Sequence, residues 1–279
     1  MIASSHTIDS SDVADHYDEL DQFYREIWGE HIHHGLWLAG SESSALAVVQ
    51  LVQLVAEKAR IGIGSHVCDI GCGYGAAARL LVRQMGAKVT AITVSPRQHS
   101  YACRVDPSGN PNYLLADWGA TDLLPESFDA AFAIESSEHM ADKVKFFYRA
   151  SHLLKSGGRM VVCSWLAAET AGRLQEKWLL KPICDESRIP HLLSAGELVN
   201  AAERAGLTRI DQTDLSRQVS RTWFIVIARL VKRLVRDPRY WSFLLDSGHQ
   251  NRIFAATVIR IWLAYRTQAM RYGIFTFAK

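Results

Sequence analysis

The sequence lacks any apolar run that could cross a membrane. Its longest uninterrupted run covers residues 223–228 and ends at Arg229, whereas a transmembrane helix needs about 20 apolar residues. The first twenty residues are acidic and contain no apolar core, so we expect no secretory signal there. A phosphate-binding Walker loop, a nucleophilic triad and a nucleic-acid-binding motif are also missing, which argues against NTPases, triad hydrolases and nucleic-acid-binding proteins.

Cysteine is scarce in the sequence and does not occur in pairs. The chain has five cysteines, an odd number, and no Cys-x-x-Cys motif. Most of them stand beside apolar residues, as in the segments VCDIGC and VVCSW. We therefore expect neither a disulfide framework nor a zinc site, and we expect the reducing environment of the cytoplasm.

The composition is that of a globular protein, but the charge is distributed unevenly. The 279 residues are 48% hydrophobic and 22% charged, which excludes a disordered or fibrous chain, and the length suits one domain with an appendage or two small domains. The net charge of +2 combines −8 over residues 1–215 with +10 over residues 216–279. This basic segment is a candidate surface for an anionic substrate, a membrane, a second copy in a homo-oligomer, or solvent alone.

Short apolar runs alternate with amphipathic patterns along most of the chain. We expect strands at residues 66–70, 88–94, 113–115, 128–134, 159–164 and 273–277. Between them, and in the C-terminal third, the spacing predicts helices at residues 45–59, 76–86, 96 onward, 142–154, 195–205, 222–236 and 251–272. Such alternation predicts an α/β fold with a largely parallel sheet.

The segment VCDIGCGYGAAA places a glycine cluster between an expected strand and an expected helix. Read as G-x-G-x-x-A, with Gly71, Gly73 and Ala76, it matches the dinucleotide fingerprint, in which a helix N-terminus binds a pyrophosphate. Read as D-x-G-x-G-x-G, with Asp69 and Gly75 included, it matches the loop that binds S-adenosylmethionine in class I methyltransferases.

Three features favour S-adenosylmethionine over a nicotinamide dinucleotide. Asp69 would repel a pyrophosphate, whereas it suits the ammonium group of an amino acid. The third glycine occupies the fifth position of the motif and not the sixth. The next strand ends with Thr93 and Ser95 and has no carboxylate, which dinucleotide-binding proteins place there to hold a ribose.

The glycine loop and the segments after it resemble the class I S-adenosylmethionine-dependent methyltransferases over residues 60–165. SFDAAFAIESSEHM is similar to the family's fourth strand and its turn, and LLKSGGRMVVCSW to the helix, turn and strand that follow. YDELDQFYREIWGEHIHHGLW, ITVSPRQ and MRYGIFTFAK resemble the gamma-tocopherol methyltransferase group and, more distantly, the cyclopropane and mycolic acid synthases. The resemblance implies a doubly wound, seven-stranded Rossmann-like sheet with an N-terminal lid and a helical substrate cap.

The same resemblance implies contacts with the cofactor. Asp117 and Trp118 would hold the adenine, Thr93 and Gln98 would contact the ribose in place of the missing carboxylate, and the lid would cover the methionine end. The full set of cofactor contacts that we expect is Tyr17, Tyr24, His34, Gly35, Asp69, Gly71, Gly73, Gly75, Thr93, Ser95, Gln98, Asp117, Trp118 and Glu135.

The catalytic candidates follow the expected fourth strand. Glu138 and His139 come at its carboxyl end, where parallel α/β sheets bind their ligands. A histidine there is suited to take a proton near neutral pH. Glu135 is the third candidate, either to hold the substrate or to stabilise positive charge.

Histidines are concentrated in the N-terminal segment, with His31, His33 and His34 close together. They suggest a metal site, but His33 and His34 are adjacent and no carboxylate or cysteine partner is evident, so we expect no metal. The other interpretations are simple N-terminal packing and the cofactor lid that the resemblance implies for this segment.

These observations predict three regions and one activity. Residues 1–44 form the lid, residues 45–166 the S-adenosylmethionine-binding core, and residues 167–279 the remaining core strands with a cap built from 167–195 and 216–265. The expected activity is methyl transfer to a small hydrophobic natural product, in first place C-methylation of an electron-rich ring or an isoprenoid double bond. O- or N-methylation is the second interpretation. Two alternatives belong to other functional classes. One is a protein that binds the cofactor without transferring a methyl group, and the other is a nicotinamide-dependent oxidoreductase.

The basic segment offers a specific alternative for the acceptor. A prenyl diphosphate would need an anion clamp, and Arg229, Lys232, Arg233 and Arg236 recur at a spacing that places them on one face of the expected helix 222–236. The same stripe is also consistent with a subunit interface or a solvated face.

Overall fold

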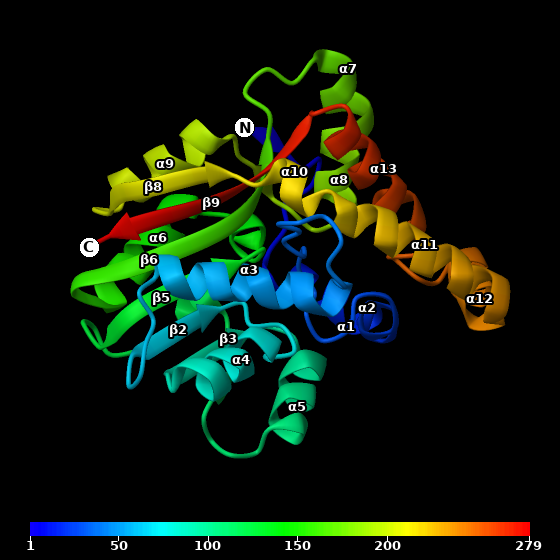
Figure 1. The fold of residues 1–279 in the computed structure, drawn as a ribbon. Coiled ribbons are helices and arrows are strands. Elements are labelled where there is room, and N and C mark those ends of the chain that lie inside the picture. Colours follow the sequence, from blue (N-terminus) through cyan, green and yellow to red (C-terminus); the bar gives the residue numbers. More distant parts are fainter.

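The computed structural model describes residues 1–279, and its centre is a seven-stranded sheet with helices on both faces (Figure 1). The sheet has the order β4-β3-β2-β5-β6-β9-β8, in which β9 runs antiparallel to both neighbours and the other pairs are parallel. This order confirms the expected doubly wound methyltransferase sheet. Its strands are β2 (His66–Ile70), β3 (Lys88–Thr93), β4 (Asn112–Leu115), β5 (Phe128–Ile134), β6 (Leu154–Ala167), β8 (Thr208–Asp214) and β9 (Met270–Ala278).

The central strands are largely apolar because both faces of the sheet are covered. In β5, Phe132 belongs to one apolar cluster and its neighbour Ala133 to the other. Side chains of α3 (Ser44–Lys58) and α4 (Ala76–Met85) join the first cluster, and those of α6 (Lys143–Leu153) and α9 (Ala195–Arg204) join the second. An uninterrupted apolar run such as AAFAI in β5 is typical of a strand that is buried on both faces.

The connections diverge between β2 and β5, which lie side by side in the sheet. From β2 the chain passes through α4 to β3 and through α5 (Pro96–Val105) to β4, whereas from β5 it passes through α6 to β6 on the other side. Open α/β sheets bind ligands in the crevice that forms at such a switch point. The glycine loop after β2 and residues 135–139 after β5 therefore face the same crevice.

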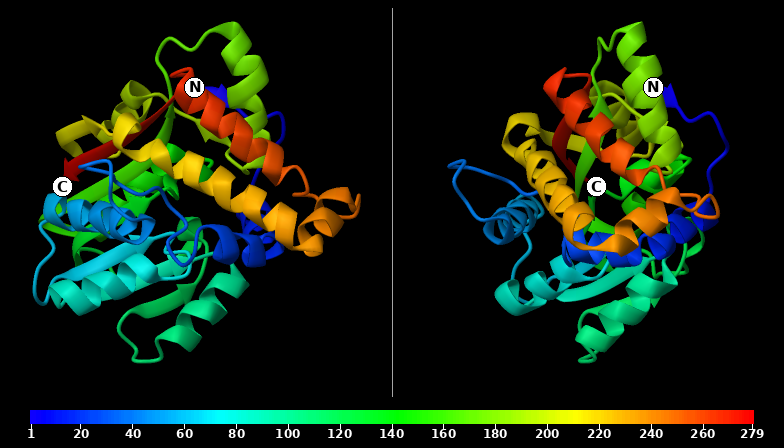
Figure 2. Two further views of the ribbon diagram at one scale, coloured as in Figure 1. Left: turned by 45° about the vertical axis from the view of Figure 1, so that its right-hand side comes forward. Right: turned by 90° about the vertical axis from the view of Figure 1, so that its right-hand side faces the viewer.

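A lid and a cap lie over this end of the sheet (Figure 2). The lid contains α1 (Ser10–Glu19) and α2 (Asp21–Ile27), and its first residues form β1 (Ile2–Ala3), which pairs with β7 (His191–Leu192). Glu26 joins lid to cap, because it accepts a hydrogen bond from Tyr240 at 3.0 Å and lies 3.4 Å from Arg233. The cap consists of α7 (Arg173–Gln175), a π-helix (Glu176–Leu180), α8 (Lys181–Glu186), α10 (Ser216–Val219), α11 (Arg221–Arg236), α12 (Pro238–Leu245) and α13 (Phe254–Arg266).

Two expected elements near the C-terminus were wrong in their bounds. The helix predicted at 251–272 is only α13, which ends at Arg266, and the strand predicted at 273–277 already begins at Met270. Gln268 lies between them with a φ of +58°, which ends the helical path. Residues 270–272 then pair with 165–167 of β6, so strand pairing overrides the helical spacing.

The edge strand β8 was not located from the sequence, and residues 167–195, which were assigned to the helical cap, also contain the short strand β7. The β8 segment TRIDQTD has no apolar alternation, and most of its side chains are exposed. Its position is fixed by pairing with β9 alone. None of the helices in the structure is both long enough and apolar enough to cross a membrane.

Candidate active site

The glycine loop brings backbone close to the crevice. Gly71, Gly73 and Gly75 have φ values of +83°, +55° and +74°, in the left-handed region that side chains disfavour. A Cβ atom on Gly71 would lie 2.3 Å from the Cβ atom of Ser136, so the fold itself requires glycine there. A Cβ atom on Gly73 would meet only the end of the Ile32 side chain, at 3.2 Å. Gly73 therefore keeps space open in the crevice without being needed for packing.

A cleft with about 580 Å³ of empty space runs past this loop, the end of β3 and the turn after β5. Its walls bring together residues that are far apart in the sequence, as the sequence predicted for a cofactor site. Those of the expected residues that line it are Tyr17, Gly71, Gly73, Thr93, Gln98, Trp118, Glu135 and His139.

Two buried polar atoms beside the cleft have no hydrogen-bond partner. The Thr93 hydroxyl donates to Oε1 of Gln98 at 2.8 Å, which leaves the Nε2 donor of Gln98 unpaired. Oδ2 of Asp69 is also unpaired, in a smaller pocket that shares Gly71 and Gly73 with the cleft. Burial raises the pKa of Asp69 to about 8. A free donor and a free carboxyl suit the hydroxyls and the ammonium group of S-adenosylmethionine, so the residues present fit this cofactor.

Several expected cofactor residues lie outside the walls of the cleft. The Ser95 hydroxyl accepts from the backbone N–H of Gln98 and also contacts Asp18 of the lid. The Asp117 carboxylate is exposed and accepts from the backbone N–H of Gly119 at 2.7 Å. The backbone N–H of Gly35 donates to Thr222 of the cap at 3.1 Å, away from the cleft. These contacts hold the segments around the cleft together.

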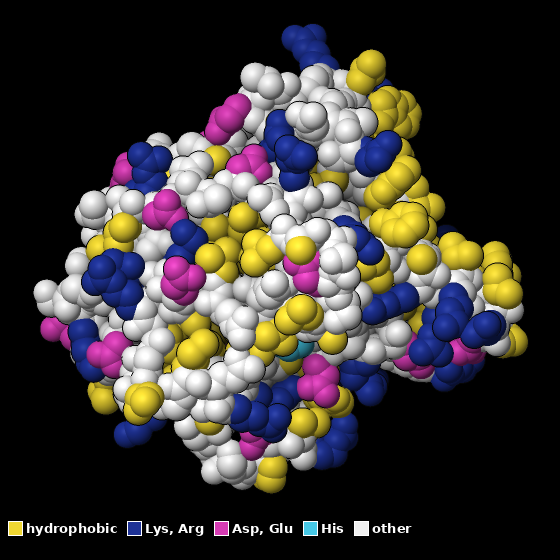
Figure 3. Space-filling view, viewed as in Figure 1, with side chains coloured by type: hydrophobic (Ala, Val, Ile, Leu, Met, Phe, Trp, Pro, Cys, Tyr) yellow, Lys and Arg dark blue, Asp and Glu magenta, His cyan; other side chains and the backbone are white.

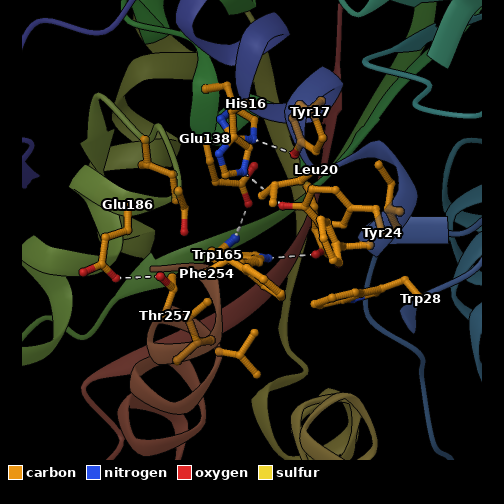
Figure 4. A pocket seen from close by; sticks show the side chains of 18 of the residues that line it. His16, Tyr17, Leu20, Tyr24, Trp28, Glu138, Trp165, Glu186, Phe254 and Thr257 are labelled. Atoms are coloured by element: carbon orange, nitrogen blue, oxygen red, sulfur yellow. Dashed lines mark hydrogen bonds between the residues drawn. The ribbon is translucent and has the colours of Figure 1, made fainter. Parts of the chain in front are cut away.

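A second cavity, with about 860 Å³ of empty space, lies between the lid, the switch point and the cap (Figure 4). Twelve of its twenty lining residues are hydrophobic, and none is lysine or arginine. Its charged groups are three glutamates, Glu135, Glu138 and Glu186. The aromatic rings in its walls are those of Tyr17, Phe23, Tyr24, Trp28, Trp165, Trp223 and Phe254.

The cleft and this cavity share a wall. Tyr17, Ile32, Glu135 and His139 line both of them, whereas Tyr24 and His34, which we expected at the cofactor, line only the second cavity. The cleft and the cavity are therefore adjacent spaces on the two sides of these four side chains.

Glu135 is the hydrogen-bonding centre of the shared wall. One of its carboxylate oxygens accepts from the backbone N–H of His34 at 2.7 Å and from Tyr272 at 2.8 Å, and the other from His34 Nδ1 at 2.9 Å and Trp165 Nε1 at 2.8 Å. Burial alone would raise the pKa of Glu135, but the electrostatic interaction and the hydrogen bonds with His34, together with the nearby His33, outweigh burial and lower it. Glu135 is therefore an anion that fixes lid, sheet and cavity wall together, and it is a very weak base.

The tautomer of His34 follows from its second partner. Trp223 Nε1 can only donate, and it lies 2.7 Å from His34 Nε2, so this nitrogen is the acceptor. The proton of His34 is then on Nδ1, where it is donated to Glu135. The sequence could place His34 near the cofactor only through a resemblance, and the structure shows that it joins the cap to Glu135.

His139 is coupled to Tyr17 of the lid. Its Nδ1 lies 2.8 Å from the backbone carbonyl oxygen of Arg188 and must donate to it. Burial lowers the pKa of His139 to about 4, so its Nε2 is unprotonated and accepts from the Tyr17 hydroxyl at 3.0 Å. An uncharged acceptor nitrogen therefore stands in the wall between cleft and cavity.

A second histidine–tyrosine pair, which the sequence did not reveal, lies deeper in the cavity. His16 Nδ1 donates to Oδ1 of Asn251 at 2.8 Å, and its Nε2 accepts from Tyr24 at 3.1 Å. Burial lowers the pKa of His16 to about 3. The many histidines of the N-terminus indicated a functional segment, but nothing in the sequence singles out His16 among them. Its partner Asn251 is 235 residues away, so no local pattern connects the two.

Glu138 and Lys143 lie close together beneath the turn after β5. The Glu138 carboxyl accepts from the backbone N–H of Trp165 at 2.5 Å, and Lys143 donates to the backbone carbonyl oxygens of Ser137 and Glu138 at 2.8 and 2.7 Å. Burial raises the pKa of Glu138 and lowers that of Lys143. Glu138 is thus the strongest carboxylate base that faces the cavity.

The remaining N-terminal histidines bind one another. His33 Nδ1 donates to the backbone carbonyl oxygen of His34 at 2.8 Å, so its Nε2 accepts from His31 Nδ1 at 3.0 Å. Burial lowers the pKa of His31 to about 3. The structure contains no group of three or more His, Cys, Asp and Glu side chains placed to hold a metal ion.

The basic stripe of α11 does not reach the cavity. Arg229 donates to the backbone carbonyl oxygen of Ile27, Arg233 lies near Glu26, and Lys232 and Arg236 are exposed. None of the four lines the aromatic cavity. The alternative of a diphosphate clamp therefore has no support from their positions.

Comparison with known proteins places these features in a family. The family model described as mycolic acid cyclopropane synthetase matches residues 4–236. Tocopherol O-methyltransferase of Arabidopsis thaliana is 28% identical, over 96% of this chain and 81% of that protein. O-methyltransferase cnsE of Penicillium expansum is 30% identical, over 75% of this chain and 76% of that protein. The solved structure of the cyclopropane synthase MmaA2 from Mycobacterium tuberculosis has a TM-score of 0.84 at 20% identity and covers 99% of this chain and 100% of that chain.

Proposed function

Because the chain belongs to the mycolic acid cyclopropane synthetase family and is an S-adenosylmethionine-dependent methyltransferase, we propose that it methylates an uncharged, hydrophobic small molecule, in first place at carbon. S-Adenosylmethionine, when bound, supplies an electrophilic methyl group. The observation that carries the proposal is the shared wall of Tyr17, Ile32, Glu135 and His139 between the cofactor cleft and the aromatic cavity.

The walls of the cavity favour an acceptor without negative charge. No lysine or arginine lines it, Glu186 is paired with Arg260, and Glu135 is an anion in its wall, so a phosphorylated or carboxylated acceptor would find no cationic partner there and would be repelled by Glu135. The aromatic rings bury an apolar body and stabilise positive charge by cation–π attraction. Both properties suit an electron-rich ring or a double bond that becomes cationic when it gains a methyl group.

The bases in the cavity also favour carbon. Most of them, Glu135, His16 and His139, have pKa values between about 2 and 4, which is far below that of a phenol, so they are poor at removing its proton. A carbocation is a strong acid and loses its proton even to a weak base. In this proposal His139 accepts that proton, Glu138 is the alternative acceptor, and Glu135 stabilises positive charge while it positions the wall.

O-Methylation is the second candidate. Two relatives named above are O-methyltransferases, and the pairs Tyr17–His139 and Tyr24–His16 could orient an acceptor hydroxyl. For this chemistry Glu138, whose pKa burial raises, would be the better proton acceptor.

We propose the same division of the chain that the sequence suggested. Residues 1–44 are the lid, 45–166 the cofactor-binding core, and 167–279 the remaining strands with the cap. The five free cysteines are compatible with a reducing cytoplasm. A homo-oligomer formed through the basic segment stays a prediction.

The experiment is methyl transfer from labelled S-adenosylmethionine to a panel of acceptors matched in size. The panel contains methyl-substituted hydroquinones, their O-protected analogues, isoprenoid alcohols and the corresponding prenyl diphosphates. We expect label in uncharged acceptors, bound to carbon by NMR, and none in the diphosphates. Label bound only to oxygen would select the second candidate, and transfer only to diphosphates would contradict the proposal.

Cofactor binding is expected to release a proton through Asp69. The pKa of about 8 means that this carboxyl is protonated at pH 7 in the free protein. An ammonium group beside it favours the carboxylate, so about one proton leaves on binding at pH 7, and affinity rises as the pH increases from 6 towards 8. Calorimetry in buffers of different protonation enthalpy measures the released proton.

Asp69→Asn is the control for this prediction, because it keeps the shape of the side chain and cannot ionise. It should bind the cofactor more weakly and without that proton. Equal proton release by the wild type and Asp69→Asn would show that Asp69 does not meet the ammonium group.

A further inference from the structure

The outer surface of the cap carries an unusual number of exposed apolar side chains. Of the nineteen large hydrophobic residues that are exposed in the whole chain, ten belong to cap helices or the α12–α13 loop, residues 174–263. On α11, Phe224, Val231 and Val235 are 65%, 53% and 80% exposed and recur at spacings of seven and four. This spacing places them on one face, which points away from the core.

Neighbouring helices continue this apolar surface. Trp241 and Leu245 are exposed one turn apart on α12, and Ile259 and Leu263 are exposed one turn apart on α13. Figure 2 shows α11, α12 and α13 next to one another in the view that faces the cap. In Figure 3, hydrophobic side chains run along the upper right edge over α7, α13 and α12, with Lys and Arg side chains beside them.

The surface is also strongly basic. Residues 216–266 contain ten Lys and Arg and only two Asp, with no Glu. Lys232, Arg236 and Arg252 are exposed and make no ion pair or hydrogen bond, although other arginines of the cap are paired. Lys177 lies 5.2 Å from the ring centre of Trp178, and Arg266 5.7 Å from that of Trp262. Trp178 is exposed and Trp262 is half-buried, and tryptophans at the surface next to cations are suited to the boundary between lipid headgroups and acyl chains.

We propose that this surface, formed by α7, the π-helix and α11–α13, docks on an anionic lipid bilayer. Its apolar side chains would enter the headgroup region, while the unpaired cations contact anionic headgroups. Symmetric pairing of two copies through this face would oppose cation to cation, which disfavours a second copy as the occupant. Anionic headgroups, in contrast, complement the excess positive charge of this surface.

The same helices separate this surface from the aromatic cavity. On α13, Thr257, Val258 and Ile261 line the cavity, whereas Ile259 and Leu263 are exposed on the outside. The cap is therefore one helix thick between the bilayer and the acceptor. The inference rests on the proposed function in one respect, that the acceptor is a hydrophobic molecule dissolved in the lipid phase.

Cosedimentation with vesicles tests the docking without any acceptor. The probes are vesicles of equal parts phosphatidylglycerol and phosphatidylcholine, and vesicles of phosphatidylcholine alone. An apolar variant, Phe224→Ser with Val235→Ser and Trp241→Ser, and a charge variant, Lys232→Glu with Arg236→Glu, alter only exposed side chains of the cap. The matched controls are Ile63→Ser with Leu124→Ser and Lys88→Glu with Lys145→Glu, all exposed on the core.

We expect the wild type and both controls to bind anionic vesicles, with at least tenfold weaker binding to phosphatidylcholine and at least tenfold weaker binding of both cap variants. Calorimetry with S-adenosylmethionine should give unchanged affinity for all variants, which shows that they are folded. The proposal would be overturned if the wild type stayed in the supernatant with anionic vesicles. It would also be overturned if the control variants lost vesicle binding to the same extent as the cap variants. A change of oligomeric state in the cap variants alone would likewise overturn it and would assign the surface to contact between copies. A chain that binds vesicles but transfers no methyl group would retain this inference and lose only the proposed function.

Discussion

Replacing Gly73 by valine is expected to weaken S-adenosylmethionine binding about a hundredfold or more, which is about 2.7 kcal/mol. Gly73 lines both the cleft and the pocket that contains Asp69, so a side chain there occupies space that the cofactor needs. The protein should stay folded, because a Cβ atom at this position meets only the end of Ile32 at 3.2 Å. Isothermal titration calorimetry measures the affinity, and circular dichroism the fold.

The control for this prediction is Gly64→Val. Gly64 has a similar backbone conformation, with a φ of +77°, and a Cβ atom there would meet nothing within 4 Å. Both variants therefore carry the strain of a β-branched residue in the left-handed region, but only Gly73→Val fills the cleft. Equal cofactor affinity in the two variants would contradict the placement of the cofactor.

Replacing His139 by alanine is expected to lower kcat by about 10²- to 10⁴-fold, the contribution typical of a positioned proton acceptor. His139 stands in the wall between cleft and cavity with its Nε2 unprotonated, and no other imidazole lines both spaces. Cofactor affinity should change little, because Thr93, Gln98 and Trp118, which we expect to contact the adenosine, lie elsewhere in the cleft. Added imidazole should restore part of the activity, which a purely structural loss would not allow.

His16→Ala is the matched comparison. His16 has the same kind of partners as His139, a donated Nδ1 proton and a tyrosine on Nε2, but it lines only the aromatic cavity. We expect His16→Ala to raise KM for the acceptor more than it lowers kcat. If His139→Ala behaved in the same way, His139 would be a binding residue and not the proton acceptor.

The glycine-loop side of the candidate cofactor cleft could be located from the sequence because its residues lie in a short continuous motif. The strand–glycine loop–helix unit from Asp69 to Gly75 fixes its own geometry, and parallel strands bring it next to the turn after β5. Thr93 and Gln98 are five residues apart and contact each other directly. Local sequence was enough for these contacts.

The acceptor side could not be predicted in the same way. His16, Trp165 and Phe254 meet only when lid, sheet and cap fold together, and no local spacing encodes that contact. Glu135 was expected to bind ligand or charge, but its four hydrogen bonds come from His34, Trp165 and Tyr272, so much of its role is structural. The edge strand β8 shows the same limit in the fold, because a polar strand held by one partner leaves no hydrophobic pattern.

The charges in and around the aromatic cavity indicate which acceptors it can bind. The chain carries its excess of positive charge on the outer surface of the cap, and the side chains of Arg229 and Arg233 are bound to the lid. Positive charge is thus available to a surface partner and absent from the space beside the shared wall. A cationic intermediate would be stabilised there, and an anionic acceptor would be excluded.

The central claim is that a methyl group is transferred from a cofactor in the cleft to an acceptor in the aromatic cavity. The transfer would take place at the boundary formed by Tyr17, Ile32, Glu135 and His139. A crystal structure with S-adenosylmethionine bound tests it most directly. The account predicts the cofactor in the cleft between Gly73 and Gln98, with its sulfonium methyl group directed past Tyr17 and His139 into the aromatic cavity. A cofactor whose methyl group faces away from that cavity, or one bound outside the cleft, would contradict the account.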